Sequence, residues 1–208
     1  MSPHRLRLFS VAALFLIYET YFPVDNKFME KQVLTLDKAS KIIQDHQVST
    51  SLVIIGIRGF SSDANKRGIY DDLIAVVMMK AGETSVDSFN ANCDPQYFQP
   101  GIANLKEGVW QYKLGIHGLN KPKEKQYKAL VQAAPVTVAR DAGKEETGMF
   151  GINIHRGSLN SVSSLGCQTI PPTFWESFLG LVESKMTKLG LNRVPYILTK
   201  KFTDLKKP

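Results

Sequence analysis

The 208-residue sequence contains only two cysteines, Cys93 and Cys167, and only four histidines. Two cysteines cannot form the multi-disulfide framework of a small secreted protein, and no Cys/His spacing matches a zinc site. We therefore expect neither a metal nor an organic cofactor. If Cys167 acts as a nucleophile it must stay reduced, so we also expect no disulfide.

The sequence also lacks, near its beginning, an apolar run long enough to cross a bilayer. Residues 8–18 are apolar and follow several basic residues, but a membrane-spanning helix needs about 20 apolar residues. This pattern is typical of a signal peptide or weak signal anchor, although no small-x-small cleavage site follows it. A helix packed on the domain or on a partner is the alternative. We expect residues 1–30 to be this segment and a connector, and residues 31–208 to be a single domain.

Basic residues outnumber acidic ones by 26 to 19, which gives a formal net charge of +7. Such a balance favours anionic partners: nucleic acid, a membrane surface or a cell-wall polymer. The excess lies largely in residues 121–128 and 200–208. Neither stretch forms an amphipathic basic helix or interleaves aromatic residues for base stacking, so we interpret both as solvated edges and expect no nucleic-acid partner.

The pattern of apolar residues predicts a mixed α+β domain that is rich in strands and has a few helices. One predicted helix covers residues 36–46, with an apolar face at Leu36, Ala39, Ile42 and Ile43. A second begins at a capping box, Thr173 with Glu176, and ends at Gly190. Predicted strands cover 51–57, 72–79, 108–116, 135–140, 148–155 and 194–198, and a hairpin joins 135–140 to 148–155.

The stretch "GINIHRGSLNSVSSLGCQTIPP", residues 151–172, places His155 at the end of a predicted strand and Cys167 twelve residues later. A free thiol is mostly protonated at neutral pH, so a catalytic cysteine needs a neighbouring base. The loop between them is rich in Ser, Gly and Asn and is long enough to bring the two side chains together. Gly166 permits a tight turn, where backbone N–H groups of Gly166 and Cys167 are available to hold an oxyanion. A buried structural cysteine and a core histidine are the alternative interpretation.

The segment "IHRG…SSLGC" resembles the active-site segment of the L,D-transpeptidase (YkuD-like) family, in which a strand ends in His and a loop leads to Ser-His-Gly-Cys. The resemblance implies a β-rich L,D-transpeptidase-like catalytic domain in which a peptidoglycan stem peptide acylates Cys167. His155 matches the base of the family, and Ser164 and Gly166 match its Ser and Gly. The backbone carbonyl that orients the imidazole falls at Arg156.

The sequence departs from the family pattern at three points. Leu165 replaces the second His, the loop is shorter than usual, and Gln168 follows the cysteine where an apolar residue and then Arg are usual. The last departure removes an arginine contact to a substrate carboxylate, and Arg156 or Arg140 would replace it. We expect Ser164 and Gln168 to contact substrate as well.

Two further stretches supply candidate substrate contacts. The loop within residues 56–72 contains Arg58, Arg67 and Tyr70, for which a solvated ion-pair loop is the alternative. His117 lies between two glycines in "GIHGL" and is a rival for the base. We prefer His155 because the family motif is local in sequence.

These observations predict a cysteine-dependent acyl-transfer enzyme acting on peptidoglycan stem peptides. It would be an L,D-transpeptidase if an amine accepts the acyl group, and an L,D-peptidase or cell-wall hydrolase if water does. Its size and charge also fit a phage lysis enzyme (endolysin) or a secreted antibacterial toxin. The expected location is the cell envelope, the periplasm or outside the cell, after a cytoplasmic stage if a phage encodes it, and residues 8–18 would supply any membrane tether. A non-catalytic cell-wall-binding or virion structural protein on the same scaffold is the alternative.

Overall fold

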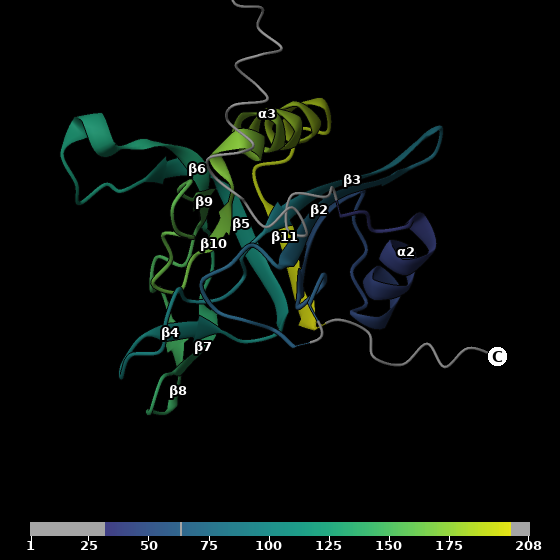
Figure 1. Ribbon diagram of the computed structural model, residues 1–208. Helices are drawn as coiled ribbons and strands as arrows, with labels where there is room; N and C mark the ends of the chain where they lie inside the picture. Colours follow the sequence, from purple (N-terminus) through teal and green to yellow (C-terminus); the bar gives the residue numbers. More distant parts are fainter. Residues whose placement is uncertain (1–31, 63, 201–208) are drawn as a thin grey trace, which may run out of the picture. The chain divides into compact units, whose positions relative to one another are not determined.

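A computed structural model of the protein describes residues 32–62 and 64–200 (Figure 1). The apolar segment 8–18 and the predicted connector, within residues 1–30, lie outside the described residues. Among the residues that are described, none forms a helix of the length and apolar character needed to cross a membrane.

The larger of two sheets has eight strands in the order β10-β9-β6-β5-β11-β1-β2-β3. The pairs β1–β11 and β9–β10 are parallel, and the other neighbours are antiparallel. Asn92, just after β3, and Thr169 in β10 exchange two backbone hydrogen bonds of 2.8 Å, so the sheet curls until its two edges meet. The strands are β1 (Leu52–Arg58), β2 (Asp72–Lys80), β3 (Glu83–Ala91), β5 (Gly108–His117), β6 (Tyr127–Gln132), β9 (Ile154–Arg156), β10 (Gln168–Ile170) and β11 (Val194–Lys200).

A smaller sheet contains β4 (Ala103–Leu105), β7 (Val136–Arg140) and β8 (Glu145–Gly148), in the order β4-β7-β8. The predicted hairpin exists, but its second strand is β8, which lies in the stretch expected to be the turn. The predicted strand 148–155 is therefore wrong as a unit. Its first residue, Gly148, ends β8 of the small sheet, and its last two residues enter β9 of the large sheet.

Two helices cover opposite faces of the large sheet (Figure 1): α2 (Leu36–Asp45) and α3 (Pro172–Lys188). Every residue of β1 is buried because the strand is covered on both faces. Its side chains alternate: Leu52 and Ile54 pack in the core shared with α3, and Val53, Ile55 and Ile57 pack in the core shared with α2. Each such side chain stabilises the fold by about 1.5–3 kcal/mol.

The predicted start of α3 is wrong, whereas its predicted end is confirmed. The helix begins at Pro172, and no side chain caps it, because a proline in the first turn has no N–H to satisfy. Thr173 is thus inside the helix rather than at its cap. Gly190 follows the last turn with φ of 62°, the left-handed conformation that glycine adopts most easily. The helix connects β10, the strand that follows Cys167, to β11 in the middle of the large sheet.

Candidate active site

Cys167 lies directly before β10, at the end of the loop that begins after β9. Its sulfur accepts a hydrogen bond from the Asn153 N–H at 3.4 Å and donates to the Gly151 carbonyl at 3.5 Å. The side chain is partly exposed, whereas the other cysteine, Cys93, is fully buried. The sulfur thus contacts two backbone polar groups, one donor and one acceptor.

The turn before Cys167 depends on a glycine. Gly166 has φ of 127°, and a β-carbon at this position would overlap the carbonyl oxygen of Ala103. The Gly166 N–H donates to Ser164 Oγ at 3.1 Å, and Ser164 Oγ donates to the Cys167 carbonyl at 2.6 Å. The Gly166 N–H is therefore not free for an oxyanion, contrary to expectation. Among the described residues none accepts a hydrogen bond from the Cys167 N–H, which leaves that group as a donor for substrate.

His155 lies in β9 and is held by two oxygen atoms. Its Nδ1 is 2.8 Å from the carbonyl of Arg156, the group that the sequence motif predicted, and 3.2 Å from the hydroxyl of Tyr127. A carbonyl only accepts hydrogen bonds, so Nδ1 must carry the proton. Nε2 then has a free lone pair, which is the form a general base requires. The predicted orientation of this imidazole is confirmed.

The fold brings His155 and Cys167 into one region. The parallel register of β9 and β10 pairs His155 with Thr169, two residues after the cysteine. The sulfur contacts the backbone of Asn153, two residues before the histidine. Tyr127, which contacts His155, also lies near enough to Cys167 that the charge of a thiolate there raises the pKa of Tyr127. No hydrogen bond joins the imidazole to the thiol in the part of the chain that is described, so the two groups are not paired.

His117, the rival candidate base, stacks on His155. The two ring centroids are 4.1 Å apart with 24° between the planes. His117 is the last residue of β5, and β6 lies between β5 and β9 and pairs with both. The structure thus brings both candidate histidines together, although they are 38 residues apart in the sequence. Asn153 Nδ2 contacts His117 Nδ1 at 3.1 Å, so Asn153 touches both this imidazole and the thiol.

The electrostatics favour uncharged groups. Burial, and next the neighbouring His117, lower the pKa of His155 to about 4. Burial raises the pKa of the Cys167 thiol, against the opposing effects of the Asn153 N–H and of Lys121. Lys121, in the connection between β5 and β6, also disfavours protonation of both imidazoles. At neutral pH the site therefore holds a thiol and a neutral imidazole rather than an ion pair.

Three of the expected substrate contacts have structural roles instead. Ser164 and Gln168 are 1% and 0% exposed, so no peptide reaches them. Gln168 donates to the Gly166 carbonyl and accepts from the Tyr196 hydroxyl, which supports the turn before the cysteine. Arg58 is 6% exposed, and its guanidinium binds Asp94, the carbonyls at 93 and 105, and an amide oxygen at 104. Because these three side chains are buried, the prediction that they contact substrate is wrong.

Arg67 and Tyr70 lie in the loop between β1 and β2, and Arg140 is the last residue of β7. The Tyr70 hydroxyl contacts the carbonyls of Ser158 and Ser161 and accepts a hydrogen bond from the Ser158 N–H. It therefore holds the loop between His155 and Cys167. Burial raises the pKa of Tyr70 to about 12, so it stays a neutral donor. Arg67 forms a two-point ion pair with Asp141 and binds the carbonyl of residue 97.

Arg140 is paired with Glu146 and stacks on Phe150 at 4.8 Å. It lines an open hollow of about 460 Å³ together with Leu165 and Ile152. Leu165 is two residues before Cys167, so the hollow adjoins the turn, although the cysteine itself does not line it. Arg140 thus remains a candidate contact for a peptide lying in this hollow, whereas Arg156 lies over the Tyr127 ring at 5.1 Å.

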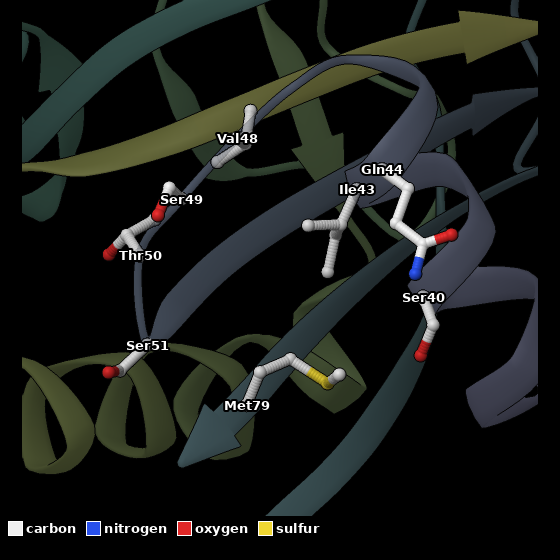
Figure 2. A pocket seen from close by; sticks show the side chains of 8 residues that line it. All are labelled: Ser40, Ile43, Gln44, Val48, Ser49, Thr50, Ser51 and Met79. Carbon is white, nitrogen blue, oxygen red and sulfur yellow. The ribbon is translucent and has the colours of Figure 1, made fainter.

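A different hollow lies against α2 and the start of β1 (Figure 2), with a volume of about 410 Å³. Hydroxyl groups of Ser40, Ser49, Thr50 and Ser51 surround apolar side chains there. It contains none of the candidate site residues and no charged group, and we assign it no function.

Sequence reasoning missed Lys121, Tyr127 and Asn153. The first two lie in the lysine-rich stretch 121–128, which we interpreted as a solvated edge. Its one aromatic residue, Tyr127, was the only feature of that stretch that indicated packing. Asn153 is two residues before His155, so strand alternation predicts that both side chains lie on one face. In the part of the chain that the structure describes, no group of three His, Cys, Asp or Glu side chains has the arrangement to hold a metal ion.

Comparison with known proteins identifies no relative. No family model matches the chain, no curated protein matches it, and no solved structure matches it. The geometry of the site and the sequence motif are therefore what bear on the function of this chain.

Proposed function

We propose that the protein is a cysteine-dependent acyl-transfer enzyme acting on peptidoglycan stem peptides, an L,D-transpeptidase or L,D-peptidase. The observation that carries this proposal is the arrangement of one partly exposed cysteine, directly before β10, and one base-form imidazole in the adjacent strand β9. The Arg156 carbonyl orients that imidazole as the motif requires. The motif supplies the substrate class, and the chemistry of the site supplies the reaction class.

The first step of the proposed reaction is acylation. Cys167 Sγ attacks the carbonyl carbon of the donor peptide while its proton moves to His155 Nε2. The S–C bond forms and the C–N bond breaks as His155 returns the proton to the leaving amine, which leaves a thioester on Cys167. Because the resting thiol and imidazole are both neutral, proton transfer accompanies attack rather than preceding it.

The second step transfers the acyl group and regenerates the thiol. His155 takes a proton from the incoming nucleophile, which attacks the thioester carbon, and the departing sulfur is protonated. An amine of a second stem peptide gives a cross-link, and water gives a shortened peptide. Cys167 is a partly exposed residue, so either acceptor can approach it from solvent.

Two cations near the site suit a substrate that carries carboxylates, as stem peptides do. Lys121 and Arg156 have no acidic partner within 4.0 Å among the described residues. In contrast, Arg58, Arg67 and Arg140 all form ion pairs. An unpaired cation beside the reacting groups attracts an anionic peptide and fixes its register.

The test is mass spectrometry of purified muropeptides incubated with wild type, Cys167→Ala and Cys93→Ala. We expect new cross-linked or shortened muropeptides with wild type and with Cys93→Ala, whose thiol is buried away from substrate. Cys167→Ala should give none. Identical products from Cys167→Ala and wild type would exclude the nucleophile. Unchanged muropeptides with the folded wild type would contradict the enzymatic assignment and favour a non-catalytic wall-binding or virion protein.

A further inference from the structure

The orientation of the Asn153 amide is fixed by a backbone group. The Gln132 N–H donates to Asn153 Oδ1 at 3.2 Å, and a backbone N–H can only donate. The oxygen of the amide must therefore face Gln132. The amide nitrogen consequently faces His117 Nδ1, 3.1 Å away.

This orientation determines the tautomer of His117. An amide NH₂ group only donates, so His117 Nδ1 must accept and carries no proton, and the proton of the neutral ring lies on Nε2. His155 has the opposite arrangement, because its Nδ1 donates to the Arg156 carbonyl. Two stacked imidazoles thus have complementary tautomers: His155 offers a lone pair at Nε2, and His117 offers an N–H at Nε2.

We propose that His117 is a second catalytic histidine, whose Nε2–H donates a hydrogen bond to the substrate carbonyl oxygen as that oxygen becomes negatively charged. This inference rests on the proposed acyl transfer to Cys167. The stack at 4.1 Å keeps both imidazoles within reach of one bound acyl group. Asn153 is the positioning residue: its side chain sets the tautomer of His117, and its backbone N–H holds the sulfur.

The site needs such a donor. An oxyanion in acyl transfer is usually stabilised by at least two hydrogen bonds, and the Gly166 N–H is already bound to Ser164. Only the Cys167 N–H remains from the turn. His117 is available in neutral form because burial, and next the charge of Lys121, lower its pKa from the ordinary value of 6.5.

Two reactions of Cys167 separate this role from that of the base. Acylation by p-nitrophenyl acetate passes through an oxyanion: the S–C bond forms, p-nitrophenolate leaves and the thiol proton goes to His155. Alkylation by iodoacetamide displaces iodide and forms no oxyanion. His117→Phe keeps an aromatic ring on His155 but removes the donor. We expect it to slow acylation about 10- to 100-fold and to leave alkylation within about twofold. His155→Ala should slow both reactions, and His46→Phe should slow neither, because His46 Nδ1 bonds to the carbonyl of residue 42 at the end of α2, away from the described site.

A second measurement reports the tautomers directly and needs no substrate. In ¹⁵N-labelled wild type at pH 7, the imidazole nitrogen shifts should identify His155 as the Nδ1–H form and His117 as the Nε2–H form. Asn153→Asp replaces the amide nitrogen with an acceptor, while its other oxygen still accepts from Gln132. This variant should place a proton on His117 Nδ1, and the same nitrogen shifts report that change.

Three results would overturn the inference. They are an Nδ1–H or charged His117 in the wild type, an equal loss of both reactions in His117→Phe, and undiminished acylation in that variant. Failure of the proposed function appears elsewhere, as wild-type protein that leaves muropeptides unchanged while p-nitrophenyl acetate still acylates Cys167.

Discussion

The pKa of His155 is the property on which its role as a base depends, and it has a measurable consequence for stability. The imidazole is 5% exposed, and burial together with its neighbours lowers its pKa from 6.5 to about 4. In the unfolded chain the same group binds a proton near pH 6.5. Acid therefore favours the unfolded state through this residue.

The sign and size of the effect follow from linkage. The folded pKa lies below the unfolded one, so the contribution of His155 to stability is intact above pH 6.5 and is lost as the pH falls through 4. A tenfold change in a proton-binding constant is worth about 1.4 kcal/mol, so the whole titration amounts to about 3 kcal/mol. About 2 kcal/mol of this is lost between pH 7 and pH 4.5.

The assay is denaturant unfolding of wild type and His155→Gln at pH 7 and pH 4.5. The variant removes the titrating group, so other groups that titrate in this range cancel in the comparison. We expect the wild type to lose about 2 kcal/mol more than the variant over this interval. Equal losses in the two proteins would show that His155 takes up its proton as readily in the folded state as in the unfolded state. That result would refute the neutral, buried base.

Three further substitutions and one matched control test the support around the thiol and the imidazole. Gly166→Ala should destabilise the fold by about 2 kcal/mol or more, since a β-carbon meets a backbone carbonyl there in addition to the strain of positive φ. Gly101→Ala, at φ of 86° with no neighbour within 4 Å, is the matched control in thermal unfolding and should cost about 1 kcal/mol. Tyr127→Phe removes the hydroxyl beside His155 and should lower acylation of Cys167 by p-nitrophenyl acetate about tenfold, whereas unchanged rates would exclude a positioning role. Tyr70→Phe should cost about 1–3 kcal/mol and speed hydrogen exchange in residues 158–161, and unaltered exchange would show that the hydroxyl does not hold this loop.

The main elements of the fold are predictable where the apolar pattern is clear. Residues 36–46 are predicted correctly as α2 from helical apolar spacing, and 51–57 as β1 from an unbroken run of β-branched and apolar residues. Strands β3 and β6 were not predicted, since neither has an unbroken alternation of apolar and polar residues. The start of α3 was misplaced because Thr173 and Glu176 fit a capping box, while Pro172 starts the helix without one.

The candidate site was predictable only in part, for a related reason. The motif gives His155, Cys167 and the Arg156 carbonyl because these are local in sequence. His117 reaches them through the pairing of β5, β6 and β9, which no local pattern encodes. Residues that support the turn, such as Gln168, differ from residues that a substrate reaches because they are buried. Which residues are buried is known only once the whole fold is known.

The central claim is that Cys167 becomes acylated with His155 as its base. Acid-quenched samples of wild type with purified muropeptides, analysed by intact mass and peptide mapping, test it most directly. The account predicts a thioester adduct on the peptide that contains Cys167, at strongly reduced levels in His155→Ala and absent in Cys167→Ala. An adduct on another residue, or one that forms as fast in His155→Ala as in wild type, would contradict it.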